Sequence, residues 1–239
     1  MLKIEHLTKA YGEKKAVDDI SLHIQKGEIY GFIGHNGAGK TTTLKACCGL
    51  LGFEKGEIYI DGVSVKENPL ACKQKIAYIP DNPDLYAFMT GVQYLNFVGD
   101  VYKVEASVRQ EKIHRYADLF EITESLGMPI GAYSHGMKQK LALIAALMHE
   151  PKLIIMDEPF VGLDPKAAHT VKQMMRELCD QGSAIFFSTH VLEVAEKLCD
   201  KVAIIKDGKL VASGTREEVT GEASLEEVFL SMAKENTDA

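Results

Sequence analysis

The sequence contains no tryptophan, and none of its apolar runs reaches the roughly eighteen residues that a membrane-spanning helix needs. It also lacks an excess of positive charge. The 27 lysines and arginines are outnumbered by 34 aspartates and glutamates, and the net charge of −7 argues against nucleic acid as a partner. Residues 1–6 do not have the shape of a signal peptide. We therefore expect a chain that stays in the cytosol without a membrane span.

The sequence has five cysteines, an odd number, and they do not have the spacing of metal ligands. We expect them to be small, reduced and mostly buried side chains: Cys47, Cys48, Cys72, Cys179 and Cys199. What the chain does have is a hydrophobic fraction of 46% beside 26% charged residues, which is ample for a core. Its 239 residues suffice for one large domain or two small ones.

The strongest chemical signal is a glycine-rich stretch near the start of the chain. Residues 34–41 read Gly-His-Asn-Gly-Ala-Gly-Lys-Thr, between an apolar run over residues 28–33 and a segment that favours helix. A G-x-x-x-x-G-K-[ST] motif in this context indicates a phosphate-binding loop. Glycines let successive backbone N–H groups point at phosphate oxygens, and the helix N-terminus adds donors. The expected nucleotide-binding residues are Gly34, His35, Asn36, Gly37, Ala38, Gly39, Lys40, Thr41 and Thr42.

The chemistry that such a loop supports assigns roles to four side chains. Lys40 is expected to reach the β- and γ-phosphates and to act in catalysis, and the hydroxyl of Thr41 to bind Mg²⁺. Residues 153–158 read as a buried strand that ends in Asp157 and Glu158. Parallel strands deliver their carboxyl ends to the ligand crevice, so Asp157 is predicted to bind Mg²⁺ and Glu158 to activate the attacking water.

His190 also follows an apolar strand, at residues 184–188. Taken alone, a histidine there would more often cap a helix or pack in the core. Beside the carboxylates and the phosphate-binding loop, we expect it to hydrogen-bond the γ-phosphate and to act in catalysis.

The apolar periodicity predicts an α/β fold. Strands are expected at residues 2–7, 16–24, 56–62 (as an edge strand), 76–79, 153–156, 184–188 and 202–205, with a turn at 206–209. Helices are expected at residues 92–102, 108–120, 138–147, 165–180 and 191–199, and two short ones within 215–234. Alternating strands and helices imply a mostly parallel sheet covered by helices. We expect one domain, 1–239, in which 1–80 and 148–239 form a nucleotide-binding core and 81–147 an inserted helical subdomain. The core would begin with an antiparallel β subdomain.

Together, these motifs resemble those of ATP-binding cassette (ABC) ATPases over nearly the whole chain. Residues 34–41 match the Walker A motif and 154–157 the Walker B strand, with Glu158 in the position of the catalytic glutamate. Residues 133–139, Tyr-Ser-His-Gly-Met-Lys-Gln, resemble the family signature, usually Leu-Ser-Gly-Gly-Gln. Residues 161–164 match the D-loop, His190 the switch histidine, and Tyr11, placed between the first two strands, the aromatic residue that stacks on adenine.

The resemblance implies ATP and Mg²⁺ as cofactors and a second nucleotide-binding subunit as partner. In the family two subunits face head to tail, so Ser134, His135, Gly136 and Asp164 would act in trans on the ATP of the partner. This chain departs from the family at His135 and Met137, where glycine and glutamine are usual, and at Asp81, where glutamine is usual. Asp81 either binds Mg²⁺ in place of that glutamine or only shapes the turn.

The resemblance further implies the ATP-hydrolysing motor of a transporter, held on the inner face of the cell membrane by a separate permease subunit. The signature, the run at 157–164 and the tail at 224–230 resemble the exporter-like, ABC-2-type branch. Apolar residues at 85, 86, 88 and 89 would either dock the permease or form ordinary core. The alternative function is a soluble ABC ATPase in a cytosolic assembly such as iron–sulfur cluster biogenesis. An unrelated P-loop enzyme would leave the signature and His190 unexplained.

Overall fold

Two β-sheets organise the part of the chain that the computed structural model describes, residues 1–221 and 223–234. The first is antiparallel, in the order β2-β1-β4-β5, and consists of β1 (Leu2–Tyr11), β2 (Lys14–Ile24), β4 (Lys55–Ile60) and β5 (Val63–Ser64). The second has the order β10-β9-β3-β8-β7-β6. Its strands are β3 (Ile29–Ile33), β6 (Ile76–Ile79), β7 (Leu153–Asp157), β8 (Ala184–Thr189), β9 (Lys201–Lys206) and β10 (Lys209–Thr215). Residue 222 and residues 235–239 of the expected domain lie outside the described residues.

The second sheet is parallel from β9 to β6, and β10 is added antiparallel to β9. Every residue of β3, β7 and β8 is buried. Strands covered on both faces read as continuous apolar runs, which explains why the sequence signal for these three was clear. The carboxyl ends of parallel strands meet at one edge of a sheet, and that edge carries the candidate site.

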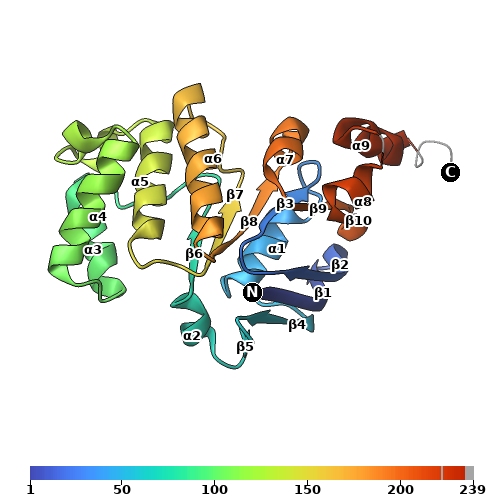
Figure 1. Ribbon diagram of the computed structural model, residues 1–239. Helices are drawn as coiled ribbons and strands as arrows, with labels where there is room; N and C mark the ends of the chain where they lie inside the picture. The colour runs from blue at the N-terminus through green and yellow to red at the C-terminus, as the bar shows by residue number, and fades with distance from the viewer. Residues whose placement is uncertain (222, 235–239) are drawn as a thin grey trace.

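The helices fall into groups along the sheet (Figure 1). α3 (Gly91–Val101), α4 (Ala106–Leu119) and α5 (His135–Leu147) pack together at one end of the molecule. α7 (Leu192–Leu198), α8 (Arg216–Thr220) and α9 (Leu225–Lys234) pack together toward the other end. The remaining helices are α1 (Lys40–Cys47), α2 (Pro69–Lys73) and α6 (Pro165–Asp180), with 3₁₀ turns at Thr123–Ser125 and Ile130–Ala132.

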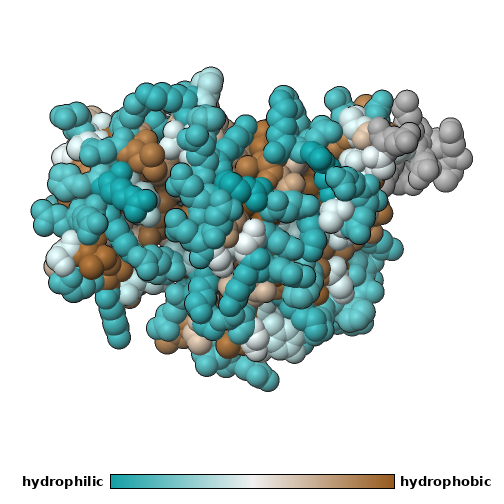
Figure 2. Space-filling model, in the orientation of Figure 1, coloured by the Kyte–Doolittle hydropathy of each residue, from teal (hydrophilic) through white to brown (hydrophobic). Residues whose placement is uncertain are grey.

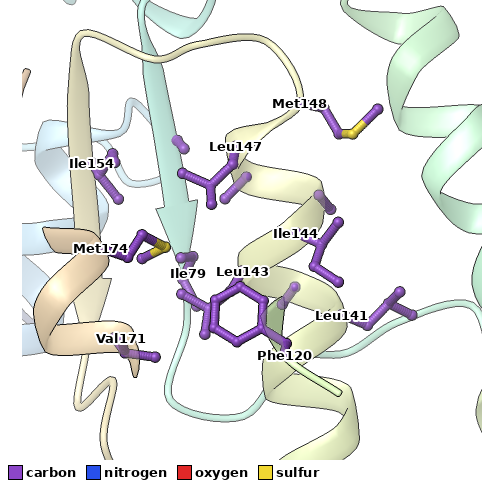
Figure 3. Close-up of a cluster of buried hydrophobic side chains, with 14 of the residues drawn as sticks. Ile79, Phe120, Leu141, Leu143, Ile144, Leu147, Met148, Ile154, Val171 and Met174 are labelled. Atoms are coloured by element: carbon purple, nitrogen blue, oxygen red, sulfur yellow. The ribbon is translucent and has the colours of Figure 1, made fainter. Parts of the chain in front are cut away.

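One hydrophobic cluster joins the α3–α5 group to the parallel sheet. Leu143 and Ile144 of α5 are completely buried and lie in the cluster with Ile79 of β6 and Ile154 of β7 (Figure 3). Phe120, at the C-terminal end of α4, belongs to the same cluster. α5 therefore supports the sheet directly, and any movement of its N-terminus is transmitted through packed side chains.

The α/β class, the mostly parallel sheet and the N-terminal antiparallel sheet agree with the sequence prediction. The prediction of an edge strand at 56–62 is wrong, because β4 lies between β1 and β5 and the Asp-Gly turn leads into β5. Tyr11 does not lie between strands but ends β1, since the ladder with β2 continues to its pairing with Lys14. α5 begins three residues earlier than expected, because the hydroxyl of Ser134 caps it.

We expect Leu143→Ala to lower the free energy of unfolding by about 2–5 kcal/mol, because it leaves a cavity in this fully packed cluster. Urea denaturation measures the change. Leu119→Ala is the matched control on α4, since this leucine is 46% exposed, and it should cost less than about 1 kcal/mol. Equal losses in the two variants would contradict the position of Leu143 in the core.

Candidate functional site

The glycine-rich loop joins the carboxyl end of β3 to the N-terminus of α1. Two of its glycines lie too close to other backbone to carry a side chain. A Cβ on Gly34 would lie 2.6 Å from the carbonyl oxygen of Ile205, and one on Gly39 would overlap the carbonyl oxygen of Ala16. Gly39 also has a φ of 111°, which residues with a side chain rarely adopt. The loop therefore fits closely between β2 and β9 and presents the N-terminus of α1, a favourable place for an anion.

The first two residues of α1 are held by hydrogen bonds. Lys40 is buried, and its ammonium donates to the carbonyl oxygens of Gly34 at 2.6 Å and His35 at 3.2 Å. The hydroxyl of Thr41 donates to Oδ2 of Asp157 at 2.6 Å. This last bond joins the start of α1 to the carboxyl end of β7.

The second carboxylate oxygen of Asp157 is also bonded. Oδ1 accepts from the hydroxyl of Ser188, which stands opposite Asp157 in the register of β7 and β8. Asp157 is only 3% exposed, and a buried carboxylate is tolerated where hydrogen bonds compensate it. The carboxylate is thus fixed in orientation by two hydroxyls.

Glu158 leaves the end of β7 with a φ of 48°, a left-handed conformation that is uncommon for residues other than glycine. Its backbone N–H donates to Ser188, 3.2 Å from the carbonyl oxygen and 3.1 Å from the hydroxyl. The carboxylate of Glu158 lies between the side chains of Lys40 and His190. Oε1 is 3.5 Å from Nζ of Lys40, and Oε2 is 2.9 Å from Nδ1 of His190 and accepts a hydrogen bond from the backbone N–H of His190 at 3.4 Å. This geometry suits a base whose position is set by its neighbours.

Lys40, Thr41, Asp157 and Glu158 line a hollow of about 290 Å³ at the carboxyl edge of the parallel sheet, whereas Ser188 and His190 lie outside its lining. Of the residues expected to bind nucleotide or metal, it brings together Asn36, Gly37, Gly39, Lys40, Thr41, Thr42, Asp81, Asp157 and Glu158. Gly34 and Ala38 of the same loop are buried and do not line the hollow. His35 also lies outside the lining, with Nδ1 2.8 Å from the carbonyl oxygen of Asn36 and Nε2 3.8 Å from the carboxylate of Asp207.

Tyr11 does not line this hollow but stands on the hairpin beside it. Its ring is 55% exposed, with the ammonium of Lys9 5.3 Å from the ring centroid. The same hairpin supplies Ala16 to the lining. Sequence reasoning missed Ala16, because a small apolar residue carries no chemical signal. It also missed Ser188, although its place at the end of an apolar strand could have drawn attention to it.

Ser134, His135, Gly136 and Asp164 lie outside this lining, at the N-termini of α5 and α6. Ser134 caps α5 by accepting from the N–H of Met137 at 3.3 Å. Asp164 caps α6 by accepting from the N–H of Ala167 at 2.9 Å. That bond lowers the pKa of Asp164, with a smaller contribution from the ammonium of Lys140 at 3.6 Å. The two helix N-termini thus form a second polar surface on the chain.

The oxygen ligands around the hollow fit Mg²⁺, which is usually held by one or two carboxylates together with phosphates and waters. Thr41 and Asp157 already lie within hydrogen-bond distance of each other, and Asp81 lines the same hollow. Within residues 1–221 and 223–234, no group of three or more His, Cys, Asp or Glu side chains could hold a metal. An ion here would take its remaining ligands from phosphate and water.

The cysteines take no part in the site. All five are free thiols, four of them buried and Cys199 partly so, as the sequence predicted. Burial raises the pKa of Cys179 to about 12, so this group stays a thiol at neutral pH and is a poor nucleophile.

A close-packed glycine loop before α1, a hydroxyl bonded to a strand-terminal aspartate, and an adjacent glutamate define a P-loop nucleoside triphosphatase. Comparison with known proteins narrows this class. The family model described as "ABC transporter" matches residues 17–161. The chain therefore belongs to the ABC transporter family, as its motifs suggested.

Individual relatives extend the likeness over almost the whole chain. The linearmycin resistance ATP-binding protein LnrL of Bacillus subtilis (strain 168) is 37% identical over 222 residues, covering 92% of this chain and 70% of that protein. The ABC-type transporter ATP-binding protein EcsA of the same organism is 32% identical over 241 residues, covering 99% and 98%. A solved structure described as the ATP-binding subunit of an ABC transporter is 33% identical, with a TM-score of 0.94, and covers 98% of this chain and 100% of that chain.

Membership of this family establishes that the chain binds and hydrolyses ATP. Across residues 1–221 and 223–234, the structure contains no helix with the length and apolar character that crossing a membrane requires.

We expect Glu158→Gln to lower kcat for ATP hydrolysis by about 10²–10⁴-fold, because the amide keeps the size of the side chain but cannot accept a proton from water. ATP should still bind, since Lys40 and the loop are unchanged. Phosphate release and equilibrium ATP binding measure the two effects. Glu193→Gln is the control on α7, where the carboxylate pairs with Lys197 at 2.7 Å. A Glu158→Gln protein with more than half of the wild-type turnover would exclude Glu158 as the base.

Proposed function

We propose that this chain is the motor subunit of an exporter-like ABC transporter and that each ATP binds between two nucleotide-binding subunits. The observation that supports the proposal is the separation of two polar surfaces on one chain, each with groups that suit phosphate. The hollow holds Lys40, Thr41 and Glu158, whereas Ser134 and Asp164 stand at helix N-termini outside its lining. Head-to-tail pairing of two chains, or of this chain with a related one, would bring the two surfaces together on one nucleotide.

In this arrangement each group has a task that its chemistry suits. Lys40 and the N–H groups of the loop bind the β- and γ-phosphates. Glu158 takes a proton from the attacking water. His190 keeps the carboxylate in position, because its Nδ1 lies 2.9 Å from Oε2 and its backbone N–H donates to the same oxygen. Ser134 and the N-terminus of α5 add donors to the γ-phosphate of the partner's ATP. Tyr11 supplies an exposed ring against which adenine can stack.

Mg²⁺, when bound, would neutralise phosphate charge, and Thr41, Asp157 and Asp81 are the residues we assign to it. The assignment of Asp81 is supported by its place in the lining of the hollow. A carboxylate at this position attracts a divalent cation more strongly than an amide would, but it adds a negative charge near Glu158.

Asp81→Gln should therefore preserve ATP hydrolysis but raise the Mg²⁺ concentration needed for half-maximal activity, by about three- to tenfold. A titration of activity against free Mg²⁺ at saturating ATP measures this shift. Asp84→Gln, in the same loop but outside the lining of the hollow, is the matched control. Superimposable titrations for Asp81→Gln and wild type would remove Asp81 from the metal site and leave it a role in the turn.

An exposed aromatic patch supports a separate membrane partner. In the loop before α3, Leu85 and Met89 pack against the core, whereas Tyr86 and Phe88 are exposed, Phe88 to 80%. The Tyr86 ring lies 5.8 Å from Phe88 and 5.7 Å from Phe97 of α3, centroid to centroid. Apolar side chains gather over α3 at the lower left of Figure 2. Such a patch is typical of a protein interface.

We assign this aromatic patch, Tyr86, Phe88 and Phe97, to the contact with a permease subunit. It belongs to the segment 81–147, which we treat as a helical subdomain set into the core of 1–80 and 148–239. The permease would hold the chain on the cytoplasmic face of the membrane. The exporter-like assignment is supported by the relative named for linearmycin resistance.

Affinity purification from detergent-solubilised native membranes, with mass spectrometry, tests the proposal. We expect a multi-span membrane protein in near-equal amount with the tagged wild-type chain. Phe88→Ser should lower its recovery about tenfold, the effect of losing an aromatic anchor that contributes ~1.4 kcal/mol. Leu70→Ser, at another strongly exposed apolar position, on α2, is the control and should leave recovery unchanged.

If only soluble proteins accompany the wild-type chain, the transport function is wrong. The ATPase would then belong to a cytosolic assembly such as iron–sulfur cluster biogenesis.

A further inference from the structure

The imidazole of His135 packs against a glycine in the loop that links the catalytic glutamate to α6. A Cβ placed on Gly162 would overlap Cδ2 of His135 and would lie 2.9 Å from its Nε2. Gly162 has a φ of 77°. The ring therefore rests on a residue that offers a flat backbone surface and has no side chain to push it away.

Two further contacts join the same elements. A Cβ on Gly136 would lie 2.8 Å from the carbonyl oxygen of Gly162, so this glycine also allows the loops to touch. The ammonium of Lys140 on α5 lies 3.6 Å from the carboxylate of Asp164, the cap of α6. The signature loop, residues 134–136, and the D-loop, residues 161–164, are thus held together within one chain.

The D-loop is in turn coupled to Glu158 through a short, internally bonded connection. The N–H of Val161 donates to the carbonyl oxygen of Glu158 at 3.2 Å, and that of Leu163 to Phe160 at 3.4 Å. The ring of Phe160 packs edge-on against Phe187 of β8, 5.9 Å between centroids, which fixes the middle of the segment. These two hydrogen bonds form consecutive turns over residues 158–163. Because the turns are joined, a displacement of Gly162 would move the backbone of Glu158.

We propose that His135 is a positioning residue that ties the signature loop to Glu158 through Gly162. When the signature loop contacts phosphate, the packed ring keeps the D-loop, and with it the carboxylate of Glu158, in the position for attack by water. In this role His135 does not itself touch the nucleotide, whereas its place in the signature suggested a contact with the ATP of the partner. The inference rests on the proposed function in one respect: the phosphate that the signature loop contacts belongs to the ATP of a partner subunit.

Steady-state ATPase kinetics of the full chain test the link. His135→Ala should lower kcat about tenfold with KM for ATP unchanged within twofold, because misplacement of a reacting group by a fraction of an ångström to 1 Å costs up to about 10²-fold. His135→Phe keeps a flat ring over Gly162 and should retain at least half of the wild-type kcat. His114→Ala removes an exposed histidine from α4 as the control and should leave both constants unchanged.

A direct contact between the imidazole and phosphate would give a different pattern. It would raise KM in His135→Ala, and His135→Phe would fail to restore activity. Either that pattern or an unchanged kcat in His135→Ala would overturn the proposal.

Self-association of Glu158→Gln with ATP separates this inference from the proposed pairing of subunits. Adding His135→Ala should leave the ATP-dependent dimer within twofold of its original affinity, whereas adding Ser134→Ala should weaken it more than tenfold. A tenfold weakening by His135→Ala would overturn the positioning role. If Ser134→Ala has no effect on association or turnover, the proposed pairing fails, while the kcat ratio of His135→Ala to His135→Phe still decides the link to Glu158.

Discussion

The hydrogen bond from the hydroxyl of Thr41 to Asp157 is the constraint on which the rest of the site depends. β3, which leads into α1, and β7, which delivers Asp157, are not neighbours, because β8 lies between them. Ser188 of β8 bonds the other oxygen of Asp157, so the carboxyl ends of three successive strands are connected through one carboxylate. A buried carboxylate tolerates little displacement, since breaking either bond leaves a charge without compensation.

From this fixed point the chain leads to both of the polar surfaces to which we assign phosphate contacts. Glu158 follows Asp157 directly and is anchored by the backbone of Ser188. Six residues later Asp164 caps α6 and lies close to Lys140 of α5, whose own N-terminus carries Ser134. Glu158 and the signature loop are therefore ends of one bonded and packed segment. In the proposed pairing of subunits, this segment would link hydrolysis at one nucleotide to contacts made with another.

The fold and most of the lining of the hollow were predictable because their signals are local. The motif at 34–41 and the strand ending in Asp157 each lie within about eight consecutive residues, and the fully buried strands read as apolar runs. Ala16 and Ser188 were not predictable, because only sheet register brings them to the site. Likewise, periodicity could not show that Phe88 is exposed while Leu85 packs on the core, since both are apolar residues in one loop.

In the proposed function, one chain holds only half of the phosphate contacts and a second subunit supplies the rest. Sedimentation velocity of Glu158→Gln with ATP and Mg²⁺ tests it most directly. We expect a dimer with ATP and a monomer with ADP, because ADP lacks the γ-phosphate that the signature loop of the partner would contact. Identical monomeric sedimentation with both nucleotides would contradict self-pairing across ATP.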